Sequence, residues 1–166
     1  MKKLLIISFL LILILKGFGQ ETISEEWILL SDSLKGCTTG GQYCDNGNCG
    51  GEACCFDISK DWQSFFKHSK EELSNFLLTQ LSDTSQSSIH ICPYFNATKG
   101  ELAVYCLQRI YKVNWYDLNL KYKHIQDGSF VKDDGNFYST QNELQKELKN
   151  KKGLDLLISE WKKKLK

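Results

Sequence analysis

The chain has 166 residues, with 21 basic and 20 acidic side chains and a net charge of +1 at neutral pH. A chain so close to neutrality has no general electrostatic attraction to DNA or RNA, so we expect no nucleic-acid partner. Hydrophobic residues make up 42% of the sequence and there is a single proline, which is typical of a folded domain rather than a disordered linker.

The first 19 residues are predicted to be a secretory signal peptide. Two lysines precede an almost wholly apolar run, residues 4–15, and Gly17 and Gly19 offer small residues for cleavage. As a helix the run would cover roughly 18 Å of a hydrocarbon core about 30 Å thick, so a retained anchor is the weaker interpretation. No later apolar run has spanning length. We therefore expect a single mature domain, residues 20–166, with a net charge of −2, in the periplasm or outside the cell.

The first predicted helix covers residues 24–35. Thr22 and Glu25 have the spacing of a capping box at its start, and Gly36 is a suitable stop at its end. Four apolar side chains recur at spacings of four, three and four residues and form one stripe: Ile23, Trp27, Leu30 and Leu34.

Five of the seven cysteines fall within residues 37–55. In an exported chain, cysteines are interpreted first as disulfide partners, because that compartment is oxidising. The segment holds five glycines and almost no apolar side chain, so bridges would have to hold it. Each bridge would contribute on the order of 2–3 kcal/mol. The disulfide candidates are Cys37, Cys44, Cys49, Cys54, Cys55, Cys92 and Cys106.

Three other interpretations of this segment are weaker. Four thiolates with Asp45 and Glu52 would suit a metal ion, but no Cys-x-x-Cys spacing occurs, so we expect neither a metal nor a cofactor. An EF-hand is rejected because Phe56 stands where the bidentate glutamate would be. A redox bridge between Cys54 and Cys55 would close a strained small ring.

Two more helices are predicted after the cysteine segment. Phe56 and Trp62 belong to a short helix that ends near His68. Ser69 and Glu72 then form a capping box for the next helix. The buried stripe of that helix is Leu73, Phe76, Leu77 and Leu81. Residues 82–88 are predicted to be a polar loop, followed by a brief alternation at 89–92 that Pro93 interrupts.

A fourth helix is predicted to start at Thr98, with Glu101 completing its capping box. Cys106 lies one turn from both Leu102 and Ile110 on the apolar face, which makes it our candidate for a buried thiol, with Cys92 as the competing partner. The odd cysteine count requires at least one thiol outside intrachain bridges.

The remainder of the chain contains an aromatic patch, turns and a helical tail. Turn residues at 127–136 flank a short apolar pair and predict a small hairpin or an irregular crossing. From Thr140 the spacing of apolar residues is helical, with Gly153 a predicted kink or break. The four lysines among the last six residues favour a solvated helix end that complements the helix dipole over a membrane or nucleic-acid contact.

Together these elements predict a mainly α fold. We expect four to six short amphipathic helices packed as helical pairs, a disulfide-rich loop and little strand, and the successive pairs could stack as in HEAT-type solenoids.

Part of the sequence resembles a known signature. Four stretches carry it: His90-Ile91-Cys92-Pro93, Asn96-Ala97-Thr98, Gly100-Glu101-Leu102-Ala103-Val104-Tyr105 and Asn114-Trp115-Tyr116. They are similar to small uncharacterised exported proteins of Bacteroidetes-type bacteria, over roughly residues 60 to 118. The resemblance implies a compact helical domain, loosely HEAT-like, and brings no established activity.

No catalytic constellation stands out. The three histidines, His68, His90 and His124, have no metal-binding spacing, and there is no nucleophile elbow or phosphate-binding loop. Glu101 is the most suggestive acid, and a helix cap explains it better. His90 with Cys92 could form a thiol–imidazole pair, but a loop histidine and a structural cysteine are favoured.

A candidate binding surface for a sugar or peptide is formed by Trp115, Tyr116 and Tyr122, although core packing is the commoner fate of such residues. Our leading hypothesis is a non-catalytic exported domain that binds a protein partner or an envelope component. The alternative is a thiol- or metal-dependent enzyme centred on residues 37–55.

Overall fold

The structure is a computed structural model that describes residues 23–38, 55–91, 95–118 and 139–166. It is mainly helical with a small three-stranded mixed sheet, which confirms the predicted mainly α class. The described residues contain more helices than the four to six predicted, because the predicted second helix and the helical tail are each divided in two. The predicted signal peptide and the predicted turn region at 127–136 lie outside the described residues, as does most of the cysteine segment.

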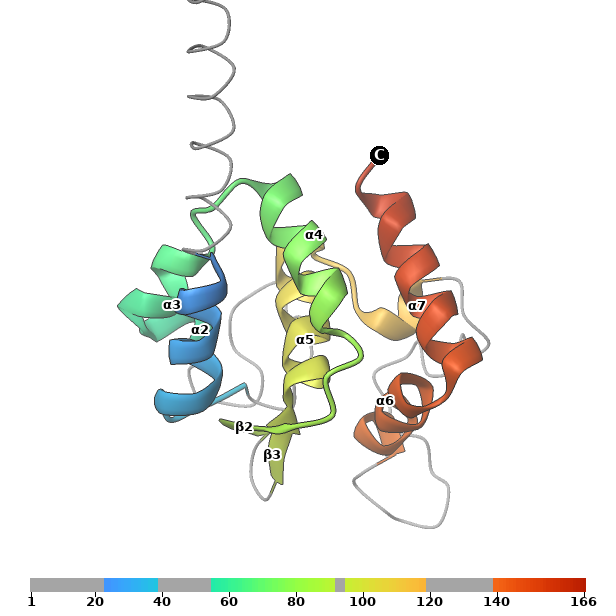
Figure 1. Ribbon diagram of the computed structural model, residues 1–166, viewed down its shortest axis with the longest axis horizontal. Helices are drawn as coiled ribbons and strands as arrows, with labels where there is room; N and C mark the ends of the chain where they lie inside the picture. Colours follow the sequence, from blue (N-terminus) through green and yellow to red (C-terminus); the bar gives the residue numbers. More distant parts are fainter. Residues whose placement is uncertain (1–22, 39–54, 92–94, 119–138) are drawn as a thin grey trace, which may run out of the picture.

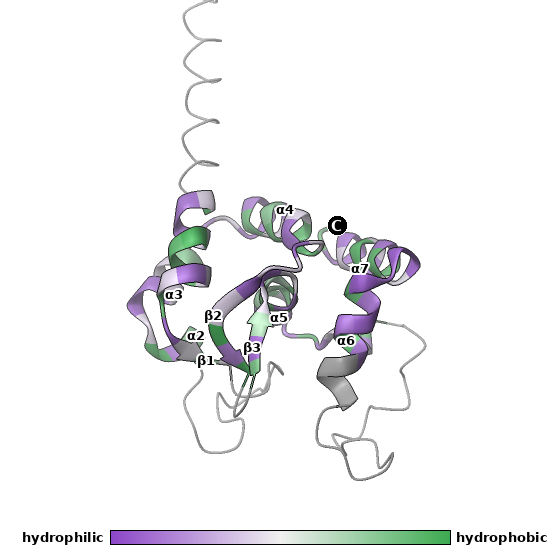
Figure 2. Ribbon diagram, turned by 60° about the horizontal axis from the view of Figure 1, so that its bottom comes forward, coloured by the Kyte–Doolittle hydropathy of each residue, from purple (hydrophilic) through white to green (hydrophobic). Residues whose placement is uncertain are grey.

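Helix α5 (Lys99–Tyr111) lies at the centre of the molecule in both ribbon views (Figures 1 and 2). Every residue from Gly100 to Gln108 is buried, because other elements surround the helix. Helix α4 (Lys70–Gln80) packs along it. On one side lie the helix 23–28, its continuation η1 (Leu29–Ser33), α2 (Cys55–Ile58) and α3 (Lys60–Phe65). On the other side lie α6 (Ser139–Lys149) and α7 (Lys151–Lys164).

Local capping sets the starts of three helices. At α4, the Ser69 hydroxyl accepts the backbone N–H of Glu72 at 3.2 Å, as predicted. At α5, the Thr98 capping box is complete. The predicted second helix is two short helices instead, because Ser59 has extended backbone angles and its side chain caps α3 separately.

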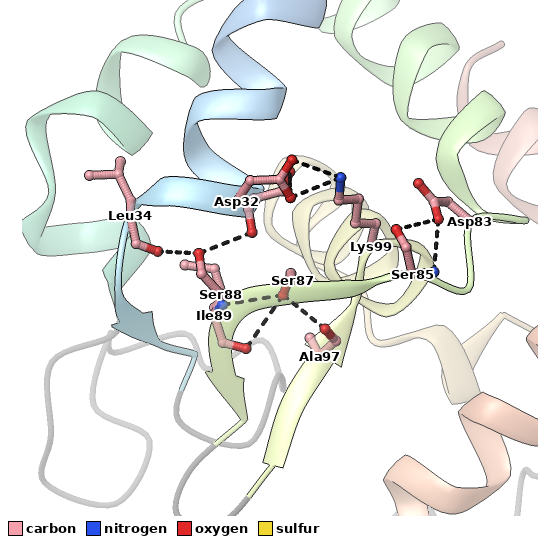
Figure 3. Close-up of polar contacts among 10 residues, drawn as sticks. Asp32, Leu34, Asp83, Ser85, Ser87, Ser88, Ile89, Ala97 and Lys99 are labelled. Carbon is pink, nitrogen blue, oxygen red and sulfur yellow. Dashed lines mark hydrogen bonds and ion pairs between the residues drawn. The ribbon is translucent and has the colours of Figure 1, made fainter.

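The predicted polar loop at 82–88 is wrong in its second half, where strand β2 (Gln86–Ile91) begins. Strand β2 is central: it pairs in parallel with β1 (Gly36–Cys37) and antiparallel with β3 (Phe95–Thr98). The Ser88 hydroxyl lies within hydrogen-bonding distance of two carbonyl oxygens at the end of the first helix, 2.6 Å from that of Leu34 and 3.0 Å from that of Ser31 (Figure 3). The Ser87 hydroxyl donates to the Ala97 carbonyl at 2.8 Å. These serines join three segments rather than forming a solvated loop.

The first helix ends differently from the prediction. Its last turn, η1, is π-helical and closes at Ser33, and Gly36 belongs to strand β1 rather than to a helix stop. A Cβ atom at Gly36 would lie 2.7 Å from the Cβ of Cys55. Glycine is therefore required here for the close approach of β1 to α2.

The break in the helical tail lies at Asn150, not at Gly153. The Asn150 side chain caps α7 by accepting the backbone N–H of Lys152 at 2.9 Å. Gly153 lies in the first turn of α7, where a Cβ would come within 2.7 Å of the Glu147 carbonyl oxygen. The missing side chain lets the end of α6 approach the start of α7.

Aromatic rings dominate the core on the α3 side. Trp27 contacts Trp62 edge-on, with ring centroids 6.5 Å apart, and also contacts Phe65 and Phe76. These contacts attach the first helix to α3 and α4. Among the described residues, the buried indole N–H groups of Trp27, Trp62 and Trp161 have no hydrogen-bond acceptor, and edge-on ring contacts suit such groups.

Candidate functional site

The exposed side of α7 carries a face of five lysines. Its inner stripe, Gly153, Leu157 and Trp161, repeats every four residues and is buried. Eleven residues make about three helical turns, so residues 151 and 152 point in nearly the same direction as residues 162 and 163. The lysine face consists of Lys151, Lys152, Lys162, Lys163 and Lys166, all exposed to solvent.

An open pocket of about 490 Å³ lies on the lysine face. Its described lining residues are Asp155, Ile158, Ser159, Lys162, Lys163 and Lys166. Leu156 is beside it on the same side of the helix and is 44% exposed. Ammonium groups next to exposed apolar carbon suit a ligand that carries negative charge and some apolar surface.

Charge is distributed unevenly between the two sides of α5. Residues 143–166, in α6 and α7, contain eight lysines and four carboxylates, a net charge of +4. The other described residues, 23–38, 55–91 and 95–118, contain seven basic and ten acidic side chains, a net charge of −3. Figure 2 shows long hydrophilic stretches along α6 and α7. The near-neutral total charge therefore includes a strongly basic end. The electric field of a charged partner would orient the molecule by this uneven distribution.

The cysteines that the structure describes are in or beside the helical core. Cys37, in β1, is disulfide-bonded. Cys55 is buried at the start of α2, and Cys106 is buried in α5 on the apolar face where the sequence predicts it. The remaining candidates, Cys44, Cys49, Cys54 and Cys92, lie outside the described residues. The pairing of the cysteines stays a prediction.

The aromatic patch is not an accessible surface at its described positions. Trp115 and Tyr116 are 2% and 7% exposed and belong to the hydrophobic core, as the core alternative requires. The backbone N–H of Trp115 donates to the Gln108 side chain at 2.8 Å, which fixes the turn after α5. Burial, with a smaller effect of Asp117, raises the pKa of Tyr116. Tyr122 lies outside the described residues.

Glu101 acts as the predicted helix cap. It is fully buried, and its Oε2 atom accepts the Thr98 backbone N–H at 2.7 Å. The side-chain amide of Gln145 donates to the same carboxylate at 3.2 Å, which ties α5 to α6. Burial, and then the Glu101 charge, hold the pKa of Tyr105 well above its usual value. These contacts give the carboxylate a structural role.

The two described histidines do not meet. The His68 ring lies 3.0 Å from a Glu26 carboxylate oxygen and links the first helix to the turn after α3. His90 is exposed in β2, opposite Asn96, and its suggested partner Cys92 lies outside the described residues. Within the described ranges, no group of three or more His, Cys, Asp or Glu side chains could hold a metal ion.

No helix among the described residues is long and apolar enough to cross a membrane. Comparisons with known proteins find no relative: no protein-family model, no curated protein and no solved structure matches this chain.

The sequence analysis noticed the lysines at residues 162–166 but interpreted them as a solvated helix end, so it did not predict the lysine face as a functional site. The cluster at residues 162–166 stands out as a run, whereas Lys151 and Lys152 look like an isolated pair near a glycine. The signal that joins them is the eleven-residue spacing from 151 to 162 and from 152 to 163. That spacing has meaning only if α7 is continuous through Gly153, which was predicted to be a break.

Proposed function

We propose that this chain is an exported, non-catalytic binding domain that recognises a negatively charged protein or envelope component through the lysine face of α7. The observation that carries this proposal is the gathering of five exposed lysines along one side of α7 and its C-terminal end, where Lys162, Lys163 and Lys166 line an open pocket. Only one acidic side chain, Asp155, is among the described pocket residues.

The charge distribution supports the same proposal. The net charge of +4 in residues 143–166 attracts a polyanion, while the net charge of −3 in the other described residues repels it. Binding would therefore take place in one orientation, with the α7 side toward the partner. Export is proposed from the signal-peptide pattern of residues 1–19. Packing as HEAT-like helical pairs, and membership among the exported Bacteroidetes-type proteins, are likewise part of this proposal.

The test compares two sets of neutralised lysines. Lys162→Gln, Lys163→Gln and Lys166→Gln together remove three charges from the lysine face. Lys35→Gln, Lys60→Gln and Lys67→Gln remove three exposed charges elsewhere and form the matched control. The probes are a soluble twenty-residue poly-glutamate peptide and vesicles of phosphatidylglycerol and phosphatidylcholine.

We expect at least one probe to bind the unaltered protein and to lose most of its affinity for the face variant, while the control variant keeps its affinity. Equal losses in both variants would mean that net charge alone drives binding. Failure of every probe to bind would refute the proposal.

A further inference from the structure

We propose that the partner of the lysine face is an anionic lipid surface, on which α7 lies flat with its lysines among the headgroups. This inference rests on the proposed function, because it names the class of partner for the same face. It adds a prediction that no soluble polyanion shares: the apolar side chains next to the lysines must also contribute to binding.

The geometry of α7 fits an interfacial helix. The helix has fourteen residues and extends along the outer side of the molecule in both ribbon views (Figures 1 and 2). Its lysines are spread over both ends, at residues 151–152 and 162–166, so the charge covers a length of helix rather than one point. A flat, laterally distributed array of anions matches such a spread better than a single phosphate does.

The lysine side chains are also suited to a lipid surface. Each lysine has a flexible stem and a compact, strongly hydrated charge. The stem lets that charge reach the lipid headgroups over a range of depths of the helix axis. Lys163 is paired with Glu160 at 2.5 Å, yet the lysine side chain remains 63% exposed and accessible to another anion.

Exposed apolar carbon completes the amphipathic pattern. Leu156 is 44% exposed and lies between the two groups of lysines along the helix, one turn from both Lys152 and Glu160. Ile158 is partly buried against the core at the opposite border of the face, where it lines the open pocket. A lipid surface would cover the exposed Leu156 side chain, whereas a soluble acidic peptide has no need of it.

The remaining charge favours a reversible and oriented contact. Because the described residues 23–38, 55–91 and 95–118 have a net charge of −3, an anionic bilayer repels that part of the molecule and favours contact through the lysine face. Each lysine near an anionic surface contributes roughly fivefold in affinity. Binding should therefore weaken strongly when the salt concentration is raised from 0.1 to 0.5 M.

The deciding experiment measures co-sedimentation of the full mature chain with vesicles of phosphatidylglycerol in phosphatidylcholine, over a range of phosphatidylglycerol fractions. The face variant of Lys162, Lys163 and Lys166 to Gln should bind about 100-fold more weakly, and the control variant of Lys35, Lys60 and Lys67 should bind as the unaltered protein does. Circular dichroism checks that every variant folds. If the face variant does not fold, the dependence of the unaltered protein on phosphatidylglycerol fraction and on salt supplies the same evidence.

A second pair of variants separates lipid from soluble polyanion. Leu156→Gln should weaken vesicle binding about fivefold. Its control, Ile58→Gln, alters a side chain that is 66% exposed on α2 and should change nothing. Both variants should leave binding to a poly-glutamate peptide unchanged.

The outcomes distinguish the two proposals. Peptide binding through the lysine face, without vesicle binding, would overturn the lipid inference and keep the proposed function. Salt-sensitive self-association of the chain in place of either interaction would overturn both, as would vesicle binding that is independent of phosphatidylglycerol. Vesicle binding that needs both the lysines and Leu156 is the result we expect.

Discussion

At the scale of single residues, Glu101 shows how one side chain can be both a local cap and a tertiary contact. Its carboxylate accepts a backbone N–H at the start of α5 and the Gln145 amide from α6. Because the group is fully buried, removing it leaves both donors without their acceptor and opens space in the core. Its counterpart in α4, Glu72, is exposed and makes only the local contact with Ser69.

This contrast predicts two different costs for the same substitution. Glu101→Ala should lower the free energy of unfolding by about 2–4 kcal/mol, since two partly buried donors lose their buried acceptor. Glu72→Ala should cost about 1 kcal/mol or less, as expected for an exposed cap contact. Urea unfolding followed by tryptophan fluorescence measures both. Equal costs would show that Gln145 contributes nothing through Glu101.

Asp83 is the residue whose titration should be visible in stability. Burial raises the pKa of its carboxyl group, but hydrogen bonds from the Ser85 hydroxyl and backbone N–H, with the nearby Lys99 charge, outweigh burial and lower the pKa below 3.8. The folded state therefore favours the charged form (Figure 3). Its contribution is fully present above the unfolded pKa and is lost as the pH falls through the folded value.

Asp83→Asn keeps the shape and removes the charge. The unaltered protein should be more stable than this variant at pH 7, and the difference should shrink as the pH falls below 3.8. Urea unfolding at a series of pH values from 7 down to 2.5 tests this. If the difference in free energy of unfolding stays constant over that range, the charge on Asp83 does not stabilise the folded state.

At the scale of elements, the start of α5 is held by a close backbone approach. The N–H of Gly100 donates to the Asp83 carbonyl at 2.8 Å, and a Cβ there would lie 2.6 Å from the Leu81 carbonyl oxygen. Both neighbours are backbone atoms at the junction of α4 and β2, so they have little freedom to move. Glycine is needed at this position for space rather than for unusual backbone angles.

Gly100→Ala should therefore destabilise the protein, although helix propensity alone would predict stabilisation. In an open helix, replacing glycine by alanine stabilises by about 1 kcal/mol. Here the added methyl group should destabilise by roughly 1–3 kcal/mol through the contact with Leu81. Asn75→Ala, at an exposed position of α4, is the control and should stabilise slightly. A more stable Gly100→Ala protein would show that the junction can relax.

The elements that sequence predicted well are those set by neighbours in the chain. Ser69 and Thr98 cap their helices with residues three positions away, so the pattern alone identifies both starts. The first half of strand β2 was missed because the Ser88 hydroxyl bonds to carbonyls more than fifty positions earlier in the chain, a contact with no local signature. Gly153 was read as a break because its packing against Glu147 is equally invisible in the sequence.

The candidate site was predictable in the same partial way. The run at residues 162–166 is evident, but its extension to Lys151 and Lys152 depends on the continuity of α7. Trp115 and Tyr116 illustrate the reverse case: aromatic side chains suit a binding surface and a core equally well, and only burial separates the two.

At the scale of the whole molecule, the separation of charge across α5 is the property that the proposals depend on. The lysines of α6 and α7 lie on one side of α5, and the other described residues carry a net charge of −3. Like charges on α7 repel one another in the isolated protein, and an anionic partner relieves that repulsion. The central claim is that the lysine face, and no other lysine-bearing surface, is the contact.

Lysine footprinting tests this claim most directly on the unaltered protein. The mature chain is acetylated briefly with and without phosphatidylglycerol vesicles, and mass spectrometry measures the modification of each lysine. We predict that the five lysines of the face, Lys151, Lys152, Lys162, Lys163 and Lys166, become several-fold less reactive, while Lys35, Lys60 and Lys67 do not change. Protection of the latter three, or equal protection of all eight, would contradict the account.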